Sequence, residues 1–448
     1  MCVLIVVISF IRVMFWGFGD MDEIWNYDMI KGIVLGYVPY RDFNWVQTPL
    51  YGFVSTIALF MSKTLLSYRI WCSIVLSVLM LLTFRVTCRK TDIYYAFPVI
   101  MACLVFTYTI NYNTLFLILT TAVFILLGAD NTKVRNVALG VLAACAALSR
   151  QSSGSLVLIV VLVVLAGKLG GEEDRRKRLQ DSLLYLVGVS LPCFVLLIYL
   201  LSTHSFFDFW NNCLFNLYAF GSENSRFSIS DTLLHFLVIF AGMICEFLTM
   251  KENKRYSIIH FLLGLAVLST IIPIVDGGHT SYAAVWFTVP IVTALRDRLG
   301  KYLKKWVSVV FSLSFGVLAV SLAVFSVWGC ARVDDCPELY GILVDRDMVS
   351  DFRYIAGRNE DYRQNGYSVN ILSSETALIS ITGNTYDPQY KGSVYDHVES
   401  ICADPNAVIL MPEDYYSEIY EYVTDNCIPL ESFGRFTWYV PKEVVQDG

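Results

Sequence analysis

An acidic pair, Asp22-Glu23, directly follows the first apolar segment of this sequence. With a reference pKa of about 3.9, an aspartate is ionised at neutral pH, and partial desolvation makes it a better general base. A short aromatic turn comes soon after and carries Tyr40, Arg41 and Asp42. The acidic pair also fits a solvated helix start, because carboxylates stabilise helix N-termini. Both interpretations stay open until the position of the pair relative to the membrane is known.

Further polar residues interrupt apolar segments later in the chain. They are Gln47 in QTPLY, Asn113 in NYNTL, Arg150 and Gln151 in SRQSS, and His279 and Tyr282 in GGHTSY. Cations can hold a phosphate, and aromatic rings can stack on a sugar. Each residue also has a structural interpretation: an arginine can anchor a helix end, and tyrosines are common at membrane interfaces.

The composition identifies an integral membrane protein. Of 448 residues, 56% are hydrophobic and 16% charged, whereas soluble domains contain about 25% charged residues. The sequence has no basic stripe with interleaved aromatic residues, so nothing in it indicates a nucleic-acid-binding surface. The twelve cysteines are scattered and show no zinc-site spacing, so we expect no structural zinc site.

About eleven segments are apolar enough to be predicted as transmembrane helices. They are 1–18, 69–87, 93–110, 114–129, 137–149, 153–167, 183–201, 231–249, 256–275, 283–295 and 306–329. The first lacks the basic flank and cleavage site of a signal peptide, so we expect it to be retained. Segment 48–63 is ambiguous, because it could span the membrane or lie along its surface.

The distribution of basic residues decides this question, since short cytoplasmic loops are rich in Lys and Arg. With 48–63 on the surface and the N-terminus inside, one set of basic residues becomes cytoplasmic. The set is Arg89, Lys90, Lys133, Arg135, Lys168, Arg175, Arg176, Lys177, Arg178, Lys251, Lys254, Arg255, Arg296, Arg298, Lys301, Lys304 and Lys305. A spanning 48–63 would place this set outside. We therefore expect an extracytoplasmic first loop over 19–68 with two surface-lying helices, and all the polar residues above on that side.

The sequence divides into a membrane domain, 1–329, and a more polar region, 330–448, that also falls outside. The latter mixes helical patterns with the strand-like runs SVNIL, AVILM and FTWYV, which predicts a small α/β domain. Four cysteines, Cys330, Cys336, Cys402 and Cys427, lie where disulfides can form, although unpaired thiols are the alternative.

Several stretches, in this order, resemble the GT-C glycosyltransferases, in the branch of protein mannosyltransferases and aminoarabinose transferases. They are DEIWNYDMIKGIVLGYVPYRDF, QTPLYGF, SYRIW, TCRK, NYNTLFLIL, NVALGVLAACAALSRQSSG and GGHTSYAAVWFTVP. The resemblance covers the first two-thirds of the chain. It implies a polytopic all-α membrane fold and transfer of a sugar from a polyprenyl-phosphate carrier.

The resemblance also implies roles by position. Asp22 matches the catalytic base of an inverting transfer, and Glu23 would assist acceptor placement or a divalent Mg²⁺ or Mn²⁺ ion. Arg41 and Arg150, with Gln151, would contact the donor phosphate; the remaining substrate contacts would be Tyr40, Asp42, Gln47, Asn113, His279 and Tyr282. Two features depart from the family pattern: Asn113 stands where many relatives carry an aspartate, and His279 is not adjacent to Tyr282.

Three functions remain in competition. The favoured one is a plasma-membrane glycosyltransferase that acts on the extracytoplasmic face, with a glycan, lipid or protein as acceptor. A transporter or flippase of lipid-linked saccharides should carry more ionisable residues within the membrane, where Arg12, His235 and Glu246 are the main ones. A sensor with an external ligand-binding domain would not require such a distinctive first loop.

Overall fold

The computed structural model describes residues 2–15, 21–43, 45–88, 93–107, 109–167, 169, 172, 174–215, 229–250, 254–272, 274–298, 330–333, 339–372, 394–413 and 417–442, with short stretches between 305 and 328. The chain divides into two compact units. The first comprises Met1–Met14, Val46–Val54 and Ile70–Phe325, and the second comprises Phe15–Trp45, Ser55–Arg69 and Ser326–Gly448.

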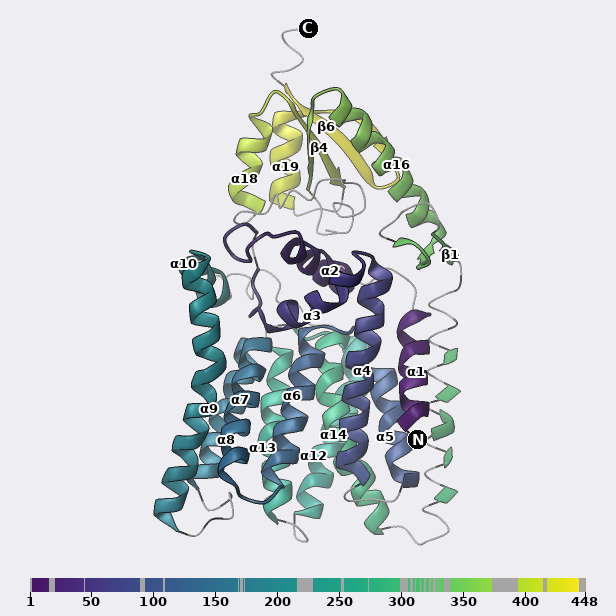
Figure 1. Cartoon of the computed structure of the whole chain (residues 1–448). Helices are drawn as coiled ribbons and strands as arrows, with labels where there is room; N and C mark the ends of the chain where they lie inside the picture. Colours follow the sequence, from purple (N-terminus) through teal and green to yellow (C-terminus); the bar gives the residue numbers. More distant parts are fainter. Residues whose placement is uncertain are drawn as a thin grey trace. The chain divides into compact units, whose positions relative to one another are not determined.

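The first unit is a bundle of helices (Figure 1). Its elements are α1 (Cys2–Met14), most of α4 (Leu65–Cys88), α5 (Ile93–Phe106), α6 (Tyr112–Leu127), α7 (Lys133–Ser149), α8 (Gln151–Ala166), α9 (Arg175–Ser202), α10 (Phe206–Trp210), the π-helical turn η2 (Asn211–Phe215), α12 (Ile229–Thr249), α13 (Lys254–Leu268), the 3-10 turn η3 (Ser269–Ile271) and α14 (Gly277–Arg298). Each predicted spanning segment before residue 300 therefore contains a helix. The last, 306–329, lies largely outside the described residues.

Within the described residues, four helices are long and apolar enough to cross a membrane. They are Leu65–Cys88, Arg175–Ser202, Ser230–Thr249 and Lys254–Ile271. Shorter apolar helices occupy Cys2–Met14, Leu50–Met61, Tyr112–Leu127 and Gln151–Ala166. The protein is thus a helical membrane protein, whereas the predicted number of eleven spans is not confirmed, because several segments form helices of only 13 to 17 residues.

Close backbone contact joins α7 to its two neighbours. A Cβ atom on Gly140 of α7 would overlap the carbonyl oxygen of Tyr185 in α9, and one on Gly188 would overlap that of Val137. Gly154 of α8 lies equally close to the backbone of Ala146. Small residues permit this approach, which drives helix association in membranes. The turn between α7 and α8 is thereby held firmly in place.

The second unit contains a four-stranded sheet in the order β3-β4-β6-β5. The strands are β3 (Ser368–Ile371), β4 (Ala407–Pro412), β5 (Cys427–Phe433) and β6 (Phe436–Pro441), and β3–β4 is the parallel pair. A two-stranded ladder of β1 (Cys330–Arg332) and β2 (Leu343–Asp345) precedes it. Three of these strands fall on the predicted runs SVNIL, AVILM and FTWYV.

Helices cover both faces of this sheet (Figure 1). On one face, α18 (Val394–Cys402) and α19 (Ser417–Asn426) pack against Ile409, Met411 and Tyr439. On the other, Tyr362 of α16 (Arg346–Gln364) contacts Trp438, with 5.0 Å between the ring centroids. All six residues of β4 and all six of β6 are buried, because helices cover both faces of the sheet, and the domain thus has three layers in the order α/β/α.

The second unit also contains most of the first loop, as Phe15–Trp45 and Ser55–Arg69, whereas Val46–Val54 belongs to the first unit. Helix α2 (Met21–Val34) starts at the acidic pair, and the Tyr27 hydroxyl donates to the carbonyl oxygen of Lys63 at 2.6 Å. Helix α3 (Leu50–Met61) and helix α4 each contribute residues to both units. Two helices therefore form in the loop where two were expected, and their position at the membrane surface stays a prediction.

Candidate functional site

Arg150 forms the junction between α7 and α8. It is the C-cap of α7 and the N-cap of α8, with an extended backbone, and only 7% of the residue is exposed. Its guanidinium donates one hydrogen bond to Asn113 Oδ1 and another, of 2.7 Å, to the carbonyl oxygen of Thr270. It also lies 5.8 Å from the ring centroid of Tyr112. The cation is therefore fixed by the start of α6 and by the turn η3 that follows α13.

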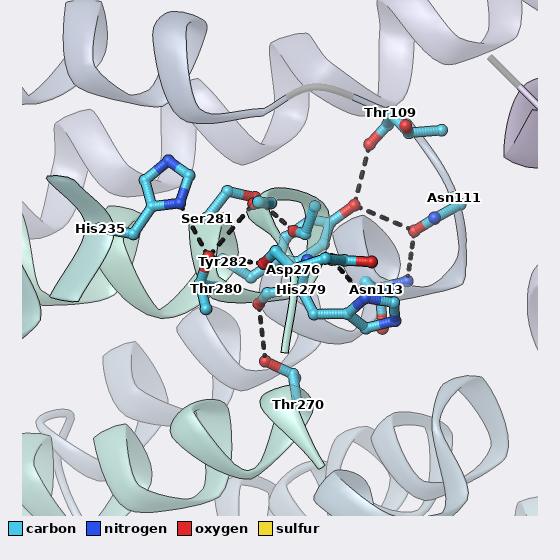
Figure 2. Close-up of polar contacts among 12 residues, drawn as sticks. Thr109, Asn111, Asn113, His235, Thr270, Asp276, His279, Thr280, Ser281 and Tyr282 are labelled. Carbon is cyan, nitrogen blue, oxygen red and sulfur yellow. Dashed lines mark hydrogen bonds and ion pairs between the residues drawn. The ribbon is translucent and has the colours of Figure 1, made fainter. Parts of the chain in front are cut away.

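A second set of contacts joins α14 to the turn before α6, as Figure 2 shows. The Tyr282 hydroxyl lies 3.0 Å from the carbonyl oxygen of Thr109 and 3.1 Å from Asn111 Oδ1. Asn111 also caps α6, because its Oδ1 accepts from the backbone N–H of Asn113 at 2.8 Å. The predicted residues Asn113, Arg150 and Tyr282 thus lie in one hydrogen-bonded cluster, although they come from three separate turns.

His279 is oriented by an aspartate that the sequence analysis did not select. Asp276 Oδ1 lies 2.8 Å from His279 Nδ1 and accepts the backbone N–H of the same residue at 2.9 Å (Figure 2). The carboxylate favours a proton on Nδ1, which leaves Nε2 of a neutral imidazole as an acceptor. The His279 carbonyl in turn accepts from Thr270 Oγ1 at 3.2 Å, which joins the dyad to the Arg150 cluster.

The sequence does contain a signal for Asp276. An aspartate three residues before a histidine is a common helix-start arrangement, in which the carboxylate accepts the N–H of the residue three positions on. The prediction placed this helix at 283–295, whereas α14 starts at Gly277. Asp276 therefore lies directly before the first turn of α14, and not in the loop that a helix over 283–295 implies.

The segment before α3 lies over the junction of α7 and α8. Gln151 Nε2 donates to the carbonyl oxygen of Val46 at 2.9 Å, and Thr48 Oγ1 donates to that of Ala147 at 3.3 Å. The Gln47 carbonyl accepts from Cys213 Sγ at 3.3 Å. Gln47 and Gln151 therefore join the cluster as neighbours of Arg150, with Gln151 holding the chain segment that carries Gln47.

The first-loop residues form a separate group within the second unit. Glu23 makes a two-pronged ion pair with Arg69: Oε1 accepts from Nε and Oε2 from Nη2, each at 2.7 Å. Arg69 is fully buried, and the Glu23 side chain is 12% exposed. Arg69, which lies in SYRIW, was not selected as a site residue. A fixed, planar arginine–carboxylate pair of this kind sets the orientation of the helix start that carries Asp22.

Asp22 occupies the first turn of α2 and is partly exposed. Its backbone carbonyl accepts from the Asn26 side-chain amide at 2.7 Å, which supports the first turn from within the helix. The carboxylate therefore stands at a helix N-terminus, where the helix dipole favours negative charge.

Tyr40, Arg41 and Asp42 form one tight turn. Asp42 Oδ2 accepts the backbone N–H of Val38 at 2.7 Å, and Arg41 Nε donates to Asp42 Oδ1 at 2.7 Å. Tyr40 has φ of +73°, a value that L-residues rarely adopt, and its buried ring stacks on Trp45 with the centroids 5.9 Å apart. Tyr40 and Asp42 thus shape the turn, and Arg41, whose side chain is 43% exposed, is presented by it.

A cavity of about 210 Å³ lies at the opposite ends of α12, α13 and α14 from the Arg150 cluster. Glu246 and His260 line it and form a pair at 2.7 Å, with each side chain 3% exposed. The rings of Tyr256 and Trp286 both stack on the imidazole. This cavity contains none of the predicted site residues. Within the part of the chain that the structure describes, no three His, Cys, Asp or Glu side chains are grouped to hold a metal ion.

Comparisons with known proteins agree with this architecture. No protein-family model and no curated protein sequence matches the chain. Among solved structures, ArnT from Cupriavidus metallidurans bound to undecaprenyl phosphate is similar with a TM-score of 0.60 and 12% identity, over 98% of this chain and 96% of ArnT. The chain has the GT-C fold.

A second neighbour supports the same assignment. The apo oligosaccharyltransferase of Archaeoglobus fulgidus is similar with a TM-score of 0.53 and 12% identity, over 92% of this chain and 69% of that one. ArnT is an aminoarabinose transferase, and both neighbours are GT-C glycosyltransferases. The fold expected from DEIWNYDMIKGIVLGYVPYRDF and the later motifs is thereby confirmed.

Proposed function

We propose that the protein is a membrane glycosyltransferase that moves a sugar from a polyprenyl-phosphate carrier to an acceptor on the extracytoplasmic face. The GT-C fold supports the class of reaction, and the neighbour solved with undecaprenyl phosphate supports this type of carrier. The observation on which the proposal depends most is Arg150, a buried cation held by Asn113 and by the carbonyl oxygen of Thr270.

Arg150 suits a donor phosphate for physical reasons. A polyprenyl phosphate leaves with a negative charge, and a fixed guanidinium stabilises that charge without reorganisation in the transition state. Arginine also presents its N–H donors in a planar fork, and the contacts to Asn113 and Thr270 fix the orientation of that plane. His279, with Nδ1 held by Asp276, supplies a second polar group beside the same turn. Arg41 is proposed as a further phosphate contact.

In the proposed reaction, Asp22 is the general base. The acceptor hydroxyl attacks the anomeric carbon and gives its proton to the Asp22 carboxylate. The bond between that carbon and the phosphate oxygen breaks, and the electron pair leaves with the polyprenyl phosphate. Attack from the opposite face inverts the anomeric configuration. Glu23, held by Arg69, is a positioning residue for this helix start.

The direct test is transfer by the protein reconstituted in liposomes, with radiolabelled polyprenyl-phosphate sugars and a panel of glycan, lipid and protein acceptors. We expect Asp22→Asn to lower kcat by 100-fold or more, in the range typical of general bases. The matched control is Asp361→Asn, which removes an exposed carboxylate of α16 and should leave transfer unchanged. Full activity of Asp22→Asn would refute the assignment of the base.

The proposed orientation places the N-terminus in the cytoplasm and residues 330–448 outside the plasma membrane. The basic loops support it through the positive-inside rule. A membrane-impermeant thiol reagent added to intact cells should label Ser152→Cys, at the start of α8, but not Lys177→Cys, in the exposed first turn of α9. The reverse labelling pattern would place the Arg150 cluster in the cytoplasm and exclude the proposed orientation.

A lipid-linked saccharide flippase is the second candidate. The observation that favours it is the buried Glu246–His260 pair beside a cavity within the helix bundle, since intramembrane ionisable pairs are common in transporters. Movement of a labelled lipid-linked sugar across acceptor-free liposomes distinguishes the two. A transferase gives product only with acceptor, whereas a flippase moves the donor without it, and Glu246→Gln should stop that movement.

A further inference from the structure

Two cysteines meet inside the C-terminal α/β domain. Cys402 is the last residue of α18, and Cys427 is the first residue of β5. Their Sγ atoms lie 3.6 Å apart, although the residues are 25 positions apart in the sequence. Both are buried, with 8% and 2% of the residue exposed. The two thiols therefore face each other directly in a folded, tightly packed region.

The surroundings hold this pair together. Val398 on α18 and Ile419 and Val423 on α19 belong to the same buried cluster as the two cysteines. Apolar neighbours of this kind restrict the motion of the two side chains. A disulfide needs the sulfur atoms about 2.05 Å apart, so the two sulfur atoms must approach each other by roughly 1.5 Å to bond.

We propose that Cys402 and Cys427 form a disulfide bond in the mature protein. The inference rests on the proposed extracytoplasmic position of this domain, because disulfides persist in oxidising compartments and are rare in the cytosol. It also selects one pairing from the four cysteines of this region.

The bond forms by thiol–disulfide exchange with an oxidised dithiol of the extracytoplasmic compartment. One thiolate attacks a sulfur of that oxidant and gives a mixed disulfide, and the second cysteine then attacks the mixed disulfide. The protein gains one S–S bond, and the oxidant leaves as a dithiol with the two electrons and two protons. Burial of both thiols places this exchange before the domain has finished folding.

The bond would close a loop that contains β4 and α19, since both lie between residues 402 and 427. Cross-linking a loop of this length restricts the unfolded chain. It would also fix α18 against β5, which is one of the two edge strands of the sheet. Loss of the bond should lower the unfolding midpoint of the domain by on the order of 10 °C.

The test blocks free thiols in intact membranes and then maps the peptides of the full-length protein. Thiols are alkylated under denaturing conditions without reductant, and the digest is analysed by mass spectrometry before and after reduction. We expect a linked peptide pair containing Cys402 and Cys427, which reduction separates. Alkylation of both cysteines before reduction would overturn the proposal, and so would a linkage of either one to a different cysteine.

Single variants test the consequence independently of the mapping. In Cys402→Ser, the thiol of Cys427 should become alkylatable and the C-terminal domain more sensitive to protease; Cys427→Ser should give the mirror result. Cys193→Ser, on the exposed face of α9, is the matched control and should change neither. The thiol-labelling test at Ser152 and Lys177 separates the causes of failure. Reduced thiols in an outward-facing domain refute the bond alone, whereas labelling in the reverse pattern refutes the proposed orientation.

Discussion

Charged groups that are buried in this protein have partners fixed by geometry, and Glu23 with Arg69 is the clearest pair. Glu23→Gln keeps the shape of the side chain but leaves the Arg69 guanidinium buried without its counter-charge. Breaking a buried pair on one side costs on the order of 3 kcal/mol. We therefore expect the thermal midpoint of the purified protein to fall clearly in Glu23→Gln.

The double variant Glu23→Leu/Arg69→Met controls for loss of packing. Removal of both charges leaves no unpaired ion, so this variant should be more stable than the sum of the two single changes predicts. Strict additivity in a double-mutant cycle would mean that the pair contributes no coupling. Transfer activity measured on the same variants would show whether the orientation of Asp22 depends on this pair.

Arg150 allows a sharper test of substrate binding. Arg150→Lys keeps the charge but loses the planar fork that contacts Asn113 and Thr270 together. Loss of one charge-assisted hydrogen bond costs about 1.5–3 kcal/mol, so we expect KM for the donor to rise by about tenfold or more. KM for the acceptor should stay constant. An unchanged donor KM would remove Arg150 from the proposed phosphate site.

The close packing of α7 against α9 depends on glycines, because the two backbones touch at Gly140 and Gly188. Gly188→Val would place side-chain atoms against the carbonyl oxygen of Val137, so α9 must move away from α7. We expect a lower yield of folded protein and a lower thermal midpoint in detergent. Gly357→Ala is the matched control, because nothing lies near its Cβ position on α16, and it should be neutral or slightly stabilising. Equal midpoints for both variants would show that the α7–α9 contact is loose.

Most helices of this fold could be predicted from the sequence, because apolar length is a local property. The same holds for β3, β4 and β6, whose apolar runs are flanked by turns. Strand β5 was missed, since its exposed and half-buried residues, such as Leu430 and Glu431, give no apolar run. Helix ends could be predicted less closely than helices, and α14 starts six residues before the predicted 283–295, which brings Asp276 to its first turn.

Partnerships across long sequence separations could not be predicted. Arg69 lies 46 residues from Glu23, and Thr270 lies 120 residues from Arg150, so no local spacing relates them. Charge distribution did predict that the turns holding Asn113, Arg150 and Tyr282 share one end of the bundle, because sidedness follows from loop composition. The role of each residue within that cluster could not be predicted from the sequence, because it depends on which atoms are in contact in the folded protein.

Acid should affect the protein through its C-terminal domain. Partial burial alone would raise the pKa of Glu431, but hydrogen bonds from Arg358 and Tyr354 outweigh it and hold the pKa below its usual value. A carboxyl with a lowered pKa stabilises the folded state above its unfolded pKa of about 4.5, and this contribution is lost as the pH falls through the folded value. We expect Glu431→Gln to be less stable than wild type at pH 7.

The difference in stability between wild type and Glu431→Gln should shrink as the pH falls through the folded-state pKa of Glu431, because that carboxyl then becomes protonated in wild type as well. Thermal midpoints recorded from pH 7 to pH 3 measure this convergence. Glu399→Gln, an exposed carboxylate on α18, controls for the loss of one negative charge. A constant gap between wild type and Glu431→Gln at all pH values would indicate that Glu431 contributes by packing rather than by its charge.

The contact between Gly140 and Gly188 also restricts how a long-chain lipid can reach the bundle interior. Where the backbones of α7 and α9 touch, no gap exists that a hydrocarbon chain could enter. An isoprenoid tail in the surrounding bilayer therefore cannot pass between α7 and α9 at the level of Gly140 and Gly188. Photo-crosslinkers on a donor tail should accordingly avoid this contact, and the helix pairs that they do mark would outline the route by which the carrier enters and leaves.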